Sequence, residues 1–339
     1  MKVLKRHNLI SQSVLTLPVC LLLALVLWWF PQRHYSHDYL ANLLLMLLTA
    51  LIITGTNARY HILRVRSYMM MAVWMFGTTM VTFLHPFTPE GSHDAPMMAA
   101  CCLAMAYHLL FHTYQKSNPV VDAFHIFFML GIGAIVMPYF VLLAPFILWH
   151  IAVFMRSLSL RTFFASLIGF LLPFWIWISW LLWKESPSPA LDWWYTLNHI
   201  ETLHYFKAVK ALGMEQIIQA VPFLTLALLT LWTTVYYLMN SYDDKIQIRM
   251  VIYVYIMQAW IIILLTVLTL NVVSFTPLLL LSICPLLAHY FTLCNSRTSL
   301  VVFWLALWAF VIIFVNTVVD ITPILNYFTT FASKIEFII

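Results

Sequence analysis

Charged residues are scarce in this sequence. Asp, Glu, Lys and Arg together make up 9% of its 339 residues, whereas hydrophobic residues make up 63%. Soluble domains carry about 25% charged residues, so this chain cannot cover itself with a surface that faces water. The composition excludes an ordinary soluble domain and predicts that a lipid bilayer surrounds most of the chain.

The sequence also has few of the residues that build cofactor sites. Its seven glycines leave little room for a phosphate-cradling loop, and no CxxC pair occurs. The five cysteines fall inside apolar runs, and the adjacent Cys101 and Cys102 suit no ordinary disulfide. We therefore predict that the cysteines are small core residues, and we predict no metal and no cofactor. The net charge of +5 comes without a basic cluster interleaved with aromatic residues, so nucleic acid is not an expected partner.

What the sequence has in abundance is long apolar runs, and the clearest of them form a pair between Pro119 and Arg156. The two runs meet at Met137-Pro138, and each has about 16 or 17 residues. Proline has no amide hydrogen and disfavours helix at the residue before it, so we expect the helix to break near Met137. Each run is slightly short for a hydrocarbon core of about 30 Å. The pattern predicts a tight helical hairpin that returns the chain to the side it left.

Nine further runs have the length of a membrane span: Val14–Phe30, Tyr39–Thr56, Tyr68–Leu84, Ala95–Tyr114, Arg161–Trp183, Gln216–Asn240, Met250–Asn271, Phe275–Cys294 and Leu300–Val319. Together with the two halves of the hairpin, these runs make about eleven spans. The predicted fold class is therefore all-α: residues 1–339 form one integral membrane domain, a polytopic transmembrane bundle. No small-x-small cleavage site follows the first run, so we expect it to stay uncleaved. The largest polar insertion covers residues 184–215 and has apolar positions three and four apart, which predicts a helix lying in the outer interface.

The charges predict the orientation of these spans. Most basic residues fall on one side: Lys2, Lys5, Arg6, Arg59, Arg64, Arg66, Lys116, Arg156, Arg161, Lys245, Arg249 and Arg297. The remaining five fall on the other side: Arg33, Lys184, Lys207, Lys210 and Lys334. Because cytoplasmic loops carry an excess of Lys and Arg, we predict that the N-terminus is inside.

The acids that could act in catalysis lie in the predicted outer loops. No Asp, Glu, Lys or Arg falls in the middle of a predicted span, which argues against a carboxylate-driven pump. The candidate catalytic bases are three outer-loop acids: Asp38, Glu90 and Asp94. The candidate substrate-binding residues are His34, His37, His93, Arg59, Arg64, Trp193 and Trp194. A structural alternative stays open, because helix ends favour His, Asp and Ser, and Asp94 would then cap a helix.

Other polar residues favour structural roles. His108 and His112 are four residues apart and share a helix face, but no Glu follows His108 as HExxH chemistry requires. Packing between helices is therefore the expected role of both. Three single histidines lie in apolar spans and are expected to bond a neighbouring helix or to line a cavity: His125, His150 and His289. Asp122, at the start of the hairpin, is an acid of the kind that the helix dipole favours.

Several short motifs around the hairpin carry a resemblance to known proteins. They are Asp122-Ala123-Phe124, Met137-Pro138, Leu160-Arg161-Thr162-Phe163, Gly169, Pro173-Phe174, Asp244-Lys245 with Arg249, Pro277 and Pro285. Over about Pro119 to Pro285 the chain resembles an uncharacterised family of polytopic inner-membrane proteins. That family occurs in Gram-negative bacteria of the Bacteroides and gliding-bacterium type. The resemblance implies a bacterial inner-membrane location and brings no activity. A looser likeness, of architecture alone, is to membrane glycosyltransferases and glycan polymerases.

Three functions are compatible with the sequence. The leading hypothesis is an enzyme that acts on lipid-linked cell-envelope glycans at the outer membrane surface, with the helix at Trp193–Leu212 over the acceptor site. The first alternative is a transporter or flippase, with the hairpin as a gate and His125 or His150 lining the path. The second is a non-catalytic subunit of an envelope assembly. The expected partners are membrane lipid, lipid-linked glycan and other envelope proteins.

Overall fold

The computed structural model describes residues 16–29, 37–63, 67–82, 95–198, 214–293, 300–308 and 310–311. Within these ranges every regular element is a helix, as the sequence predicts. The α-helices are α2 (Thr16–Trp29), α3 (His37–Tyr60), α4 (Met69–Thr82), α5 (Pro96–His112), α6 (Val120–Val136), α7 (Ala144–Val153), α8 (Leu160–Trp183), α9 (Ser188–Asn198), α11 (Met214–Asn240), α12 (Ile246–Thr269) and α13 (Val272–Leu293). Two short 3₁₀ helices, η1 (Pro138–Leu143) and η3 (Ser241–Asp243), lie in connections.

Five helices are long and apolar enough to cross a membrane. Their spanning segments are Leu40–Tyr60, Leu160–Trp183, Phe223–Asn240, Ile246–Thr269 and Ser274–Leu293. Shorter apolar helices accompany them, among them α5, α6 and the η1–α7 segment. These helices identify a candidate multi-pass membrane protein. A total of eleven spans and an inside N-terminus stay predictions.

The hairpin forms as the sequence predicts. Helix α6 ends at Val136, and Met137 is extended, with φ −138° and ψ 102°. Pro138 then begins η1, which leads into α7. The backbone N–H of Gln115, after α5, donates to the carbonyl of Met155, after α7, at 2.9 Å. The hairpin therefore brings the chain back to the end of the bundle from which it left.

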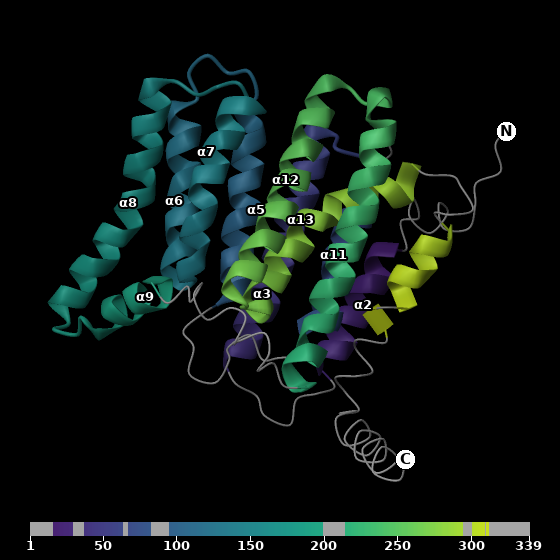
Figure 1. Ribbon diagram of the computed structural model, residues 1–339, viewed down its shortest axis with the longest axis horizontal. Helices are drawn as coiled ribbons and strands as arrows, with labels where there is room; N and C mark the ends of the chain where they lie inside the picture. The colour runs from purple at the N-terminus through teal and green to yellow at the C-terminus, as the bar shows by residue number, and fades with distance from the viewer. Residues whose placement is uncertain are drawn as a thin grey trace, which may run out of the picture.

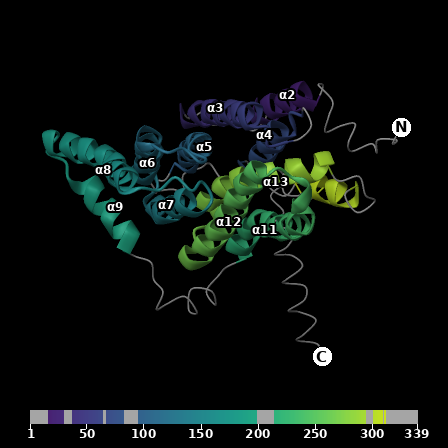
Figure 2. The same ribbon diagram turned by 90° about the horizontal axis from the view of Figure 1, so that it is seen from above.

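Helix α13 is the centre of the described bundle. It packs against α4 and α5 on one side and against α11 and α12 on the other, and nearly all of its side chains are buried. Figures 1 and 2 show α13 between these neighbours, with α8 and α9 at one edge of the molecule. The hydroxyl groups of Tyr107 and Ser282 lie 3.1 Å apart and join α5 to α13. A hydroxyl pair inside an apolar bundle satisfies both groups where no water is present.

Several helices end without a glycine, in keeping with the small number of glycines. Gln115, Arg156, Glu185 and Leu270 follow helix ends with φ between 52° and 54°. A left-handed residue closes a helix by letting backbone N–H groups reach the last carbonyls. At Leu270 this bond runs from its N–H to the carbonyl of Thr266, at 2.8 Å. Glycine is more common at such positions because a Cβ is strained there, and asparagine is tolerated because its short side chain can hydrogen-bond locally.

Candidate functional site

Helices α3 and α5 lie side by side and run in the same direction. Near their ends, the Thr56 hydroxyl lies 2.9 Å from Nδ1 of His108, and the Tyr60 hydroxyl donates to the His108 carbonyl at 3.1 Å. One to two turns earlier on each helix, the side chains of Thr49 and Cys101 interact. The two residues of each pair, Thr56 with His108 and Thr49 with Cys101, are 52 positions apart in the sequence. Because this separation is constant, the two helices are parallel. Their first residues therefore lie at one end of the bundle.

The end of α6 joins two further segments at that same end. The N–H of Ala95, which begins the approach to α5, donates to the Val136 carbonyl at 3.4 Å. The indole Nε1 of Trp193, on α9, donates to the Ala134 carbonyl at 2.7 Å. Figure 1 shows α9 lying across this end, at an angle to the other helices. The last turn of α6 thus holds both α9 and the residue that follows Asp94 in the sequence.

Five of the ten predicted catalytic and binding residues lie outside the described part of the chain. These are His34, Arg64, Glu90, His93 and Asp94. His37 and Asp38 form the first turn of α3, where the backbone is described and the side chains are not. The structure thus places the backbone of Asp38 and Ala95 at one end, together with α9.

The two tryptophans predicted to bind substrate, Trp193 and Trp194, differ in environment. Trp193 is partly buried, and its ring lies edge-on to Phe174 of α8 with centroids 5.3 Å apart. Trp194 is 55% exposed. A helix forms over Ser188–Asn198, and the remainder of the predicted Trp193–Leu212 helix, from residue 199 on, lies outside the described residues. The place of this helix at a membrane surface stays a prediction. Trp193 fixes α9 to the bundle, which leaves Trp194 as the tryptophan that is free to meet another molecule.

Arg59 lies at the other end of the bundle. It is in the last turn of α3 and is exposed. Lys116, Arg156, Arg161 and Arg249 lie at helix ends on that side too, which we call the basic end. The structure therefore does not bring Arg59 together with Trp193 or with the start of α5.

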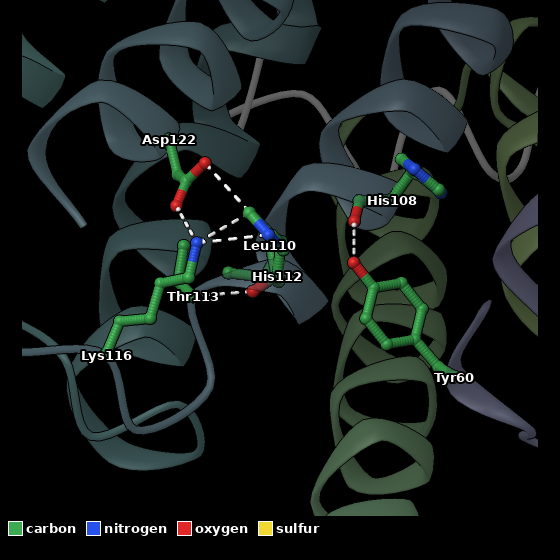
Figure 3. A network of polar contacts seen from close by, with 7 residues as sticks. All are labelled: Tyr60, His108, Leu110, His112, Thr113, Lys116 and Asp122. Carbon is green, nitrogen blue, oxygen red and sulfur yellow. Dashed lines mark hydrogen bonds and ion pairs between the residues drawn. The ribbon is translucent and has the colours of Figure 1, made fainter.

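The basic end carries a polar network that joins α5 to α6 (Figure 3). Lys116 Nζ lies 2.9 Å from Oδ2 of Asp122, and His112 Nδ1 lies 3.0 Å from Oδ1 of the same carboxylate. Lys116 Nζ also lies 2.8 Å from His112 Nδ1. Since one ring nitrogen cannot both accept from Lys116 and donate to Asp122, the tautomer and protonation of His112 decide which bond forms. The network closes the turn between α5 and α6.

The electrostatics of this network favour the ionised form of Asp122, which lies in the first turn of α6, outside the five helices of spanning length. Burial opposes ionisation of this carboxyl, but hydrogen bonds from Lys116 and His112 outweigh burial and hold the pKa of Asp122 below its ordinary value. The positive end of the α6 dipole acts in the same direction. Asp122 is therefore a charged anchor at neutral pH and a poor candidate for a general base.

A second pair at the basic end joins the α11–α12 turn to α13. Asp244 Oδ2 lies 3.1 Å from Nε2 of His289, and both side chains are almost fully buried. The ring of Tyr237 lies edge-on to the His289 ring, with centroids 5.2 Å apart. A buried carboxylate needs such polar neighbours, because burial without them costs several kcal/mol. The pair acts as a structural lock between three helices.

The sequence contained a signal for the first network, but none for the partner of His289 in the second pair. His108, His112 and Lys116 recur at intervals of four, so they follow one helix face toward the tight turn before Asp122. The expectation that His108 and His112 serve contacts between helices agrees with these bonds. The partner of His289 could not be read from the sequence, since Asp244 is far from it along the chain.

Among the residues that the structure describes, no group of three or more His, Cys, Asp and Glu side chains could hold a metal ion. The described cysteines Cys20, Cys101, Cys102 and Cys284 are free thiols. No known protein family, curated protein or solved structure matches this chain.

Proposed function

We propose that the chain is a bacterial inner-membrane enzyme that acts on lipid-linked cell-envelope glycans at the outer membrane surface. One observation carries the proposal: the last turn of α6 binds both Ala95 and Trp193, through the carbonyls of Val136 and Ala134. Asp94 therefore adjoins, in the sequence, a residue that is held beside the interfacial helix α9. The first turn of α3, with Asp38, begins at the same end.

Such a site suits transfer of a sugar from a lipid phosphate. One carboxylate accepts the proton of an acceptor hydroxyl while that oxygen forms a bond to the anomeric carbon of the donor. The bond from the anomeric carbon to the lipid phosphate breaks, and the phosphate leaves with the electron pair. Asp38, Glu90 and Asp94 are the candidates for the base. Trp194, exposed on α9, offers an apolar face to a sugar ring at the membrane surface.

The proposed orientation puts this end of the bundle outside. With eleven spans and the N-terminus inside, the basic end faces the cytoplasm, in line with the excess of Lys and Arg in cytoplasmic loops. Lys184 and α9 then lie at the outer surface, where the sugar chemistry of a lipid-linked glycan is accessible.

The test uses isosteric variants of the three acids: Asp38→Asn, Glu90→Gln and Asp94→Asn. Each is expressed in a strain that lacks the native copy, and its envelope glycan is extracted and quantified. Loss of a general base lowers the rate by roughly 10²–10⁴-fold, so at least one variant should abolish the glycan while its abundance in the membrane is normal. Asp192→Asn is the matched control, because Asp192 is an exposed acid on α9. Normal glycan in all three variants would exclude the enzyme.

A transporter is the second candidate, and buried polar side chains favour it. His150 of α7 and Gln258 of α12 are both fully buried. Within the described residues, neither amide atom of Gln258 has a hydrogen-bond partner. The ring of Phe154, which follows α7, contacts both His150 of α7 and Tyr253 of α12, with ring centroids 5.6 and 6.3 Å apart. His125, by contrast, is exposed on α6 and faces away from this interior.

Cysteine labelling distinguishes the transporter from a closed bundle. In a cysteine-free background, cysteine at position 150 or 258 should react with a small membrane-impermeant thiol reagent if a water-filled path reaches this depth. Lys184→Cys, at an exposed position, is the positive control that shows the extent of full labelling. No reaction at 150 and 258 would remove the transporter.

A further inference from the structure

A deep groove lies on the side of the molecule away from α8 and α9. It runs between α2, α4, α13 and the helical residues 300–308 and 310–311, with a volume of about 380 Å³. Figure 2 shows α2, α4 and residues 300–308 on the side of α13 that faces away from α8 and α9. Its walls include Leu23, Ala72, Phe76, Phe291, Phe303 and Ala306. A hollow of this size lies within the range of ligand sites in proteins.

Aromatic contacts hold the inner walls of the groove in place. Phe291 of α13 meets Phe303 edge-on, with ring centroids 5.0 Å apart. Phe76 of α4 meets Phe310 in the same way, with centroids 6.1 Å apart. Phe291, Phe303 and Phe310 are almost fully buried. The walls are thus built from well-packed side chains on the central helix and its neighbours, and the hollow belongs to the fold.

The chemistry of the groove selects an apolar occupant. Every lining side chain is apolar apart from the weakly polar thiol of Cys20. Apolar cavities of about 150 Å³ stay dry and bind apolar molecules, so water is not the expected occupant of this larger one. The groove opens beside α2, where Val19 and Leu23 are 52% and 43% exposed. In a bilayer, the molecules that reach such an opening are lipid chains.

The position of the groove indicates at which end of the bundle the lipid headgroup lies and which charge it carries. Its walls include the first turn of α4, at Met69 and Ala72, and the last turns of α13, at Leu287 and Phe291. These turns lie at the basic end, because α4 follows the end of α3 that carries Arg59. The described residues at this end include three acids, Asp122, Asp243 and Asp244, of which Asp122 pairs with Lys116 and buried Asp244 lies 3.1 Å from His289. The basic residues described there are Arg59, Lys116, Arg156, Arg161, Lys245 and Arg249. The balance of charge is therefore positive, which complements an anionic headgroup.

We propose that this groove is a binding site for one acyl chain of an anionic phospholipid, whose headgroup lies at the basic end. The lipid is a resident component that fills the space between α2, α4, α13 and residues 300–311. This site is separate from the glycan site at the α9 end, so neither proposal depends on the other.

Filling the groove with a side chain tests the proposal. Ala306→Phe places a ring in the groove. Leu305→Phe is the matched control, because Leu305 is the preceding residue, does not line the groove and is 63% exposed. The protein is extracted with its native lipids, and retained phospholipid is counted by native mass spectrometry. The wild type and Leu305→Phe should retain one phospholipid, and Ala306→Phe should retain several-fold less. Ala72→Phe, on the opposite wall, should repeat the loss if Ala306→Phe does not fold.

Photo-crosslinking identifies the occupant. The probe is phosphatidylglycerol with a diazirine in one acyl chain, in vesicles of phosphatidylcholine that contain the wild-type protein. Crosslinks should map to α2 or to residues 300–308, and unlabelled phosphatidylglycerol should compete better than phosphatidylcholine. Equal competition would overturn the anionic headgroup. Retention of lipid by Ala306→Phe and Ala72→Phe at the wild-type level would overturn the site. Protein–protein crosslinks through the groove, to residues 312–339 or to a second copy, would overturn the lipid as occupant.

Discussion

Gly131 of α6 lies directly against the backbone of Phe170 in α8. A Cβ added at Gly131 would come within 2.6 Å of the Phe170 carbonyl oxygen and 2.9 Å of Cγ of Pro173. Gly169 of α8 faces the Phe124 carbonyl of α6 in the same manner. Two glycines therefore bring the backbones of α6 and α8 together, as small residues do between membrane helices.

This close approach predicts the effect of Gly131→Ala. Alanine favours helix over glycine by about 0.5–1 kcal/mol, but overpacking against a backbone costs about 1–3 kcal/mol. The clash should win, so the melting temperature in detergent should fall. Gly55→Ala is the control, because nothing lies within 4 Å of an added Cβ at Gly55. It should leave the melting temperature unchanged or raise it, and equal behaviour of the two variants would contradict the α6–α8 packing.

The bond from Trp193 to Ala134 predicts a difference between two adjacent tryptophans. Trp193→Phe removes a 2.7 Å hydrogen bond and leaves the Ala134 carbonyl without its indole donor. The loss of such a bond lowers the free energy of unfolding by about 0.5–1.5 kcal/mol. Backbone amides of α9 should then exchange hydrogen faster. Trp194→Phe changes an exposed ring and should leave exchange as in the wild type. Unchanged protection in Trp193→Phe would show that this bond does not hold α9.

The buried position of Asp244 predicts a large effect at its partner. His289→Ala removes the imidazole that lies 3.1 Å from a buried carboxylate, and removing one partner of a buried polar group costs about 1–3 kcal/mol. His125→Ala, at an exposed histidine of α6, should change stability by less than about 0.5 kcal/mol. Unfolding in denaturing detergent measures both. Similar stability of the two variants would contradict the lock between α11, α12 and α13.

The lowered pKa of Asp122 predicts a pH-dependent contribution at the α5–α6 turn. A carboxyl with a depressed pKa contributes stability above its unfolded-state pKa, and this contribution is lost as the pH falls through the folded-state pKa. Asp122→Asn should therefore lower stability at neutral pH, by up to about 1 kcal/mol because the pair is partly exposed. The difference from the wild type should shrink below pH 3.8, the ordinary value for this group. A constant difference down to pH 2 would contradict ionisation of Asp122 as its cause.

The proposed orientation predicts opposite labelling of two lysine positions. Lys184 follows α8 at the α9 end, and Lys116 follows α5 at the basic end. In a cysteine-free background, Lys184→Cys should react with an impermeant thiol reagent added to spheroplasts. Lys116→Cys should react only after the membrane is opened. The reverse pattern would place the N-terminus outside and move the proposed glycan site to the cytoplasm.

The sequence by itself determined the helices and their approximate limits. Long apolar runs can bury their backbone polar groups in lipid only as helices, and Pro138 ended one run because proline cannot continue the backbone bonding. Such signals are local, so the break at Met137 and the presence of a helix at α9 could be predicted from neighbouring residues alone.

Only the tertiary structure decided which helices meet. The bonds of Ala95 and Trp193 to the end of α6, the pair of Asp244 with His289, and the groove beside α13 join residues that are distant in sequence. In lipid, apolar side chains gain little from choosing one helix over another, so small residues and a few polar contacts select the neighbours. These contacts leave no periodic signal, and the arrangement of the site therefore had to be seen in three dimensions.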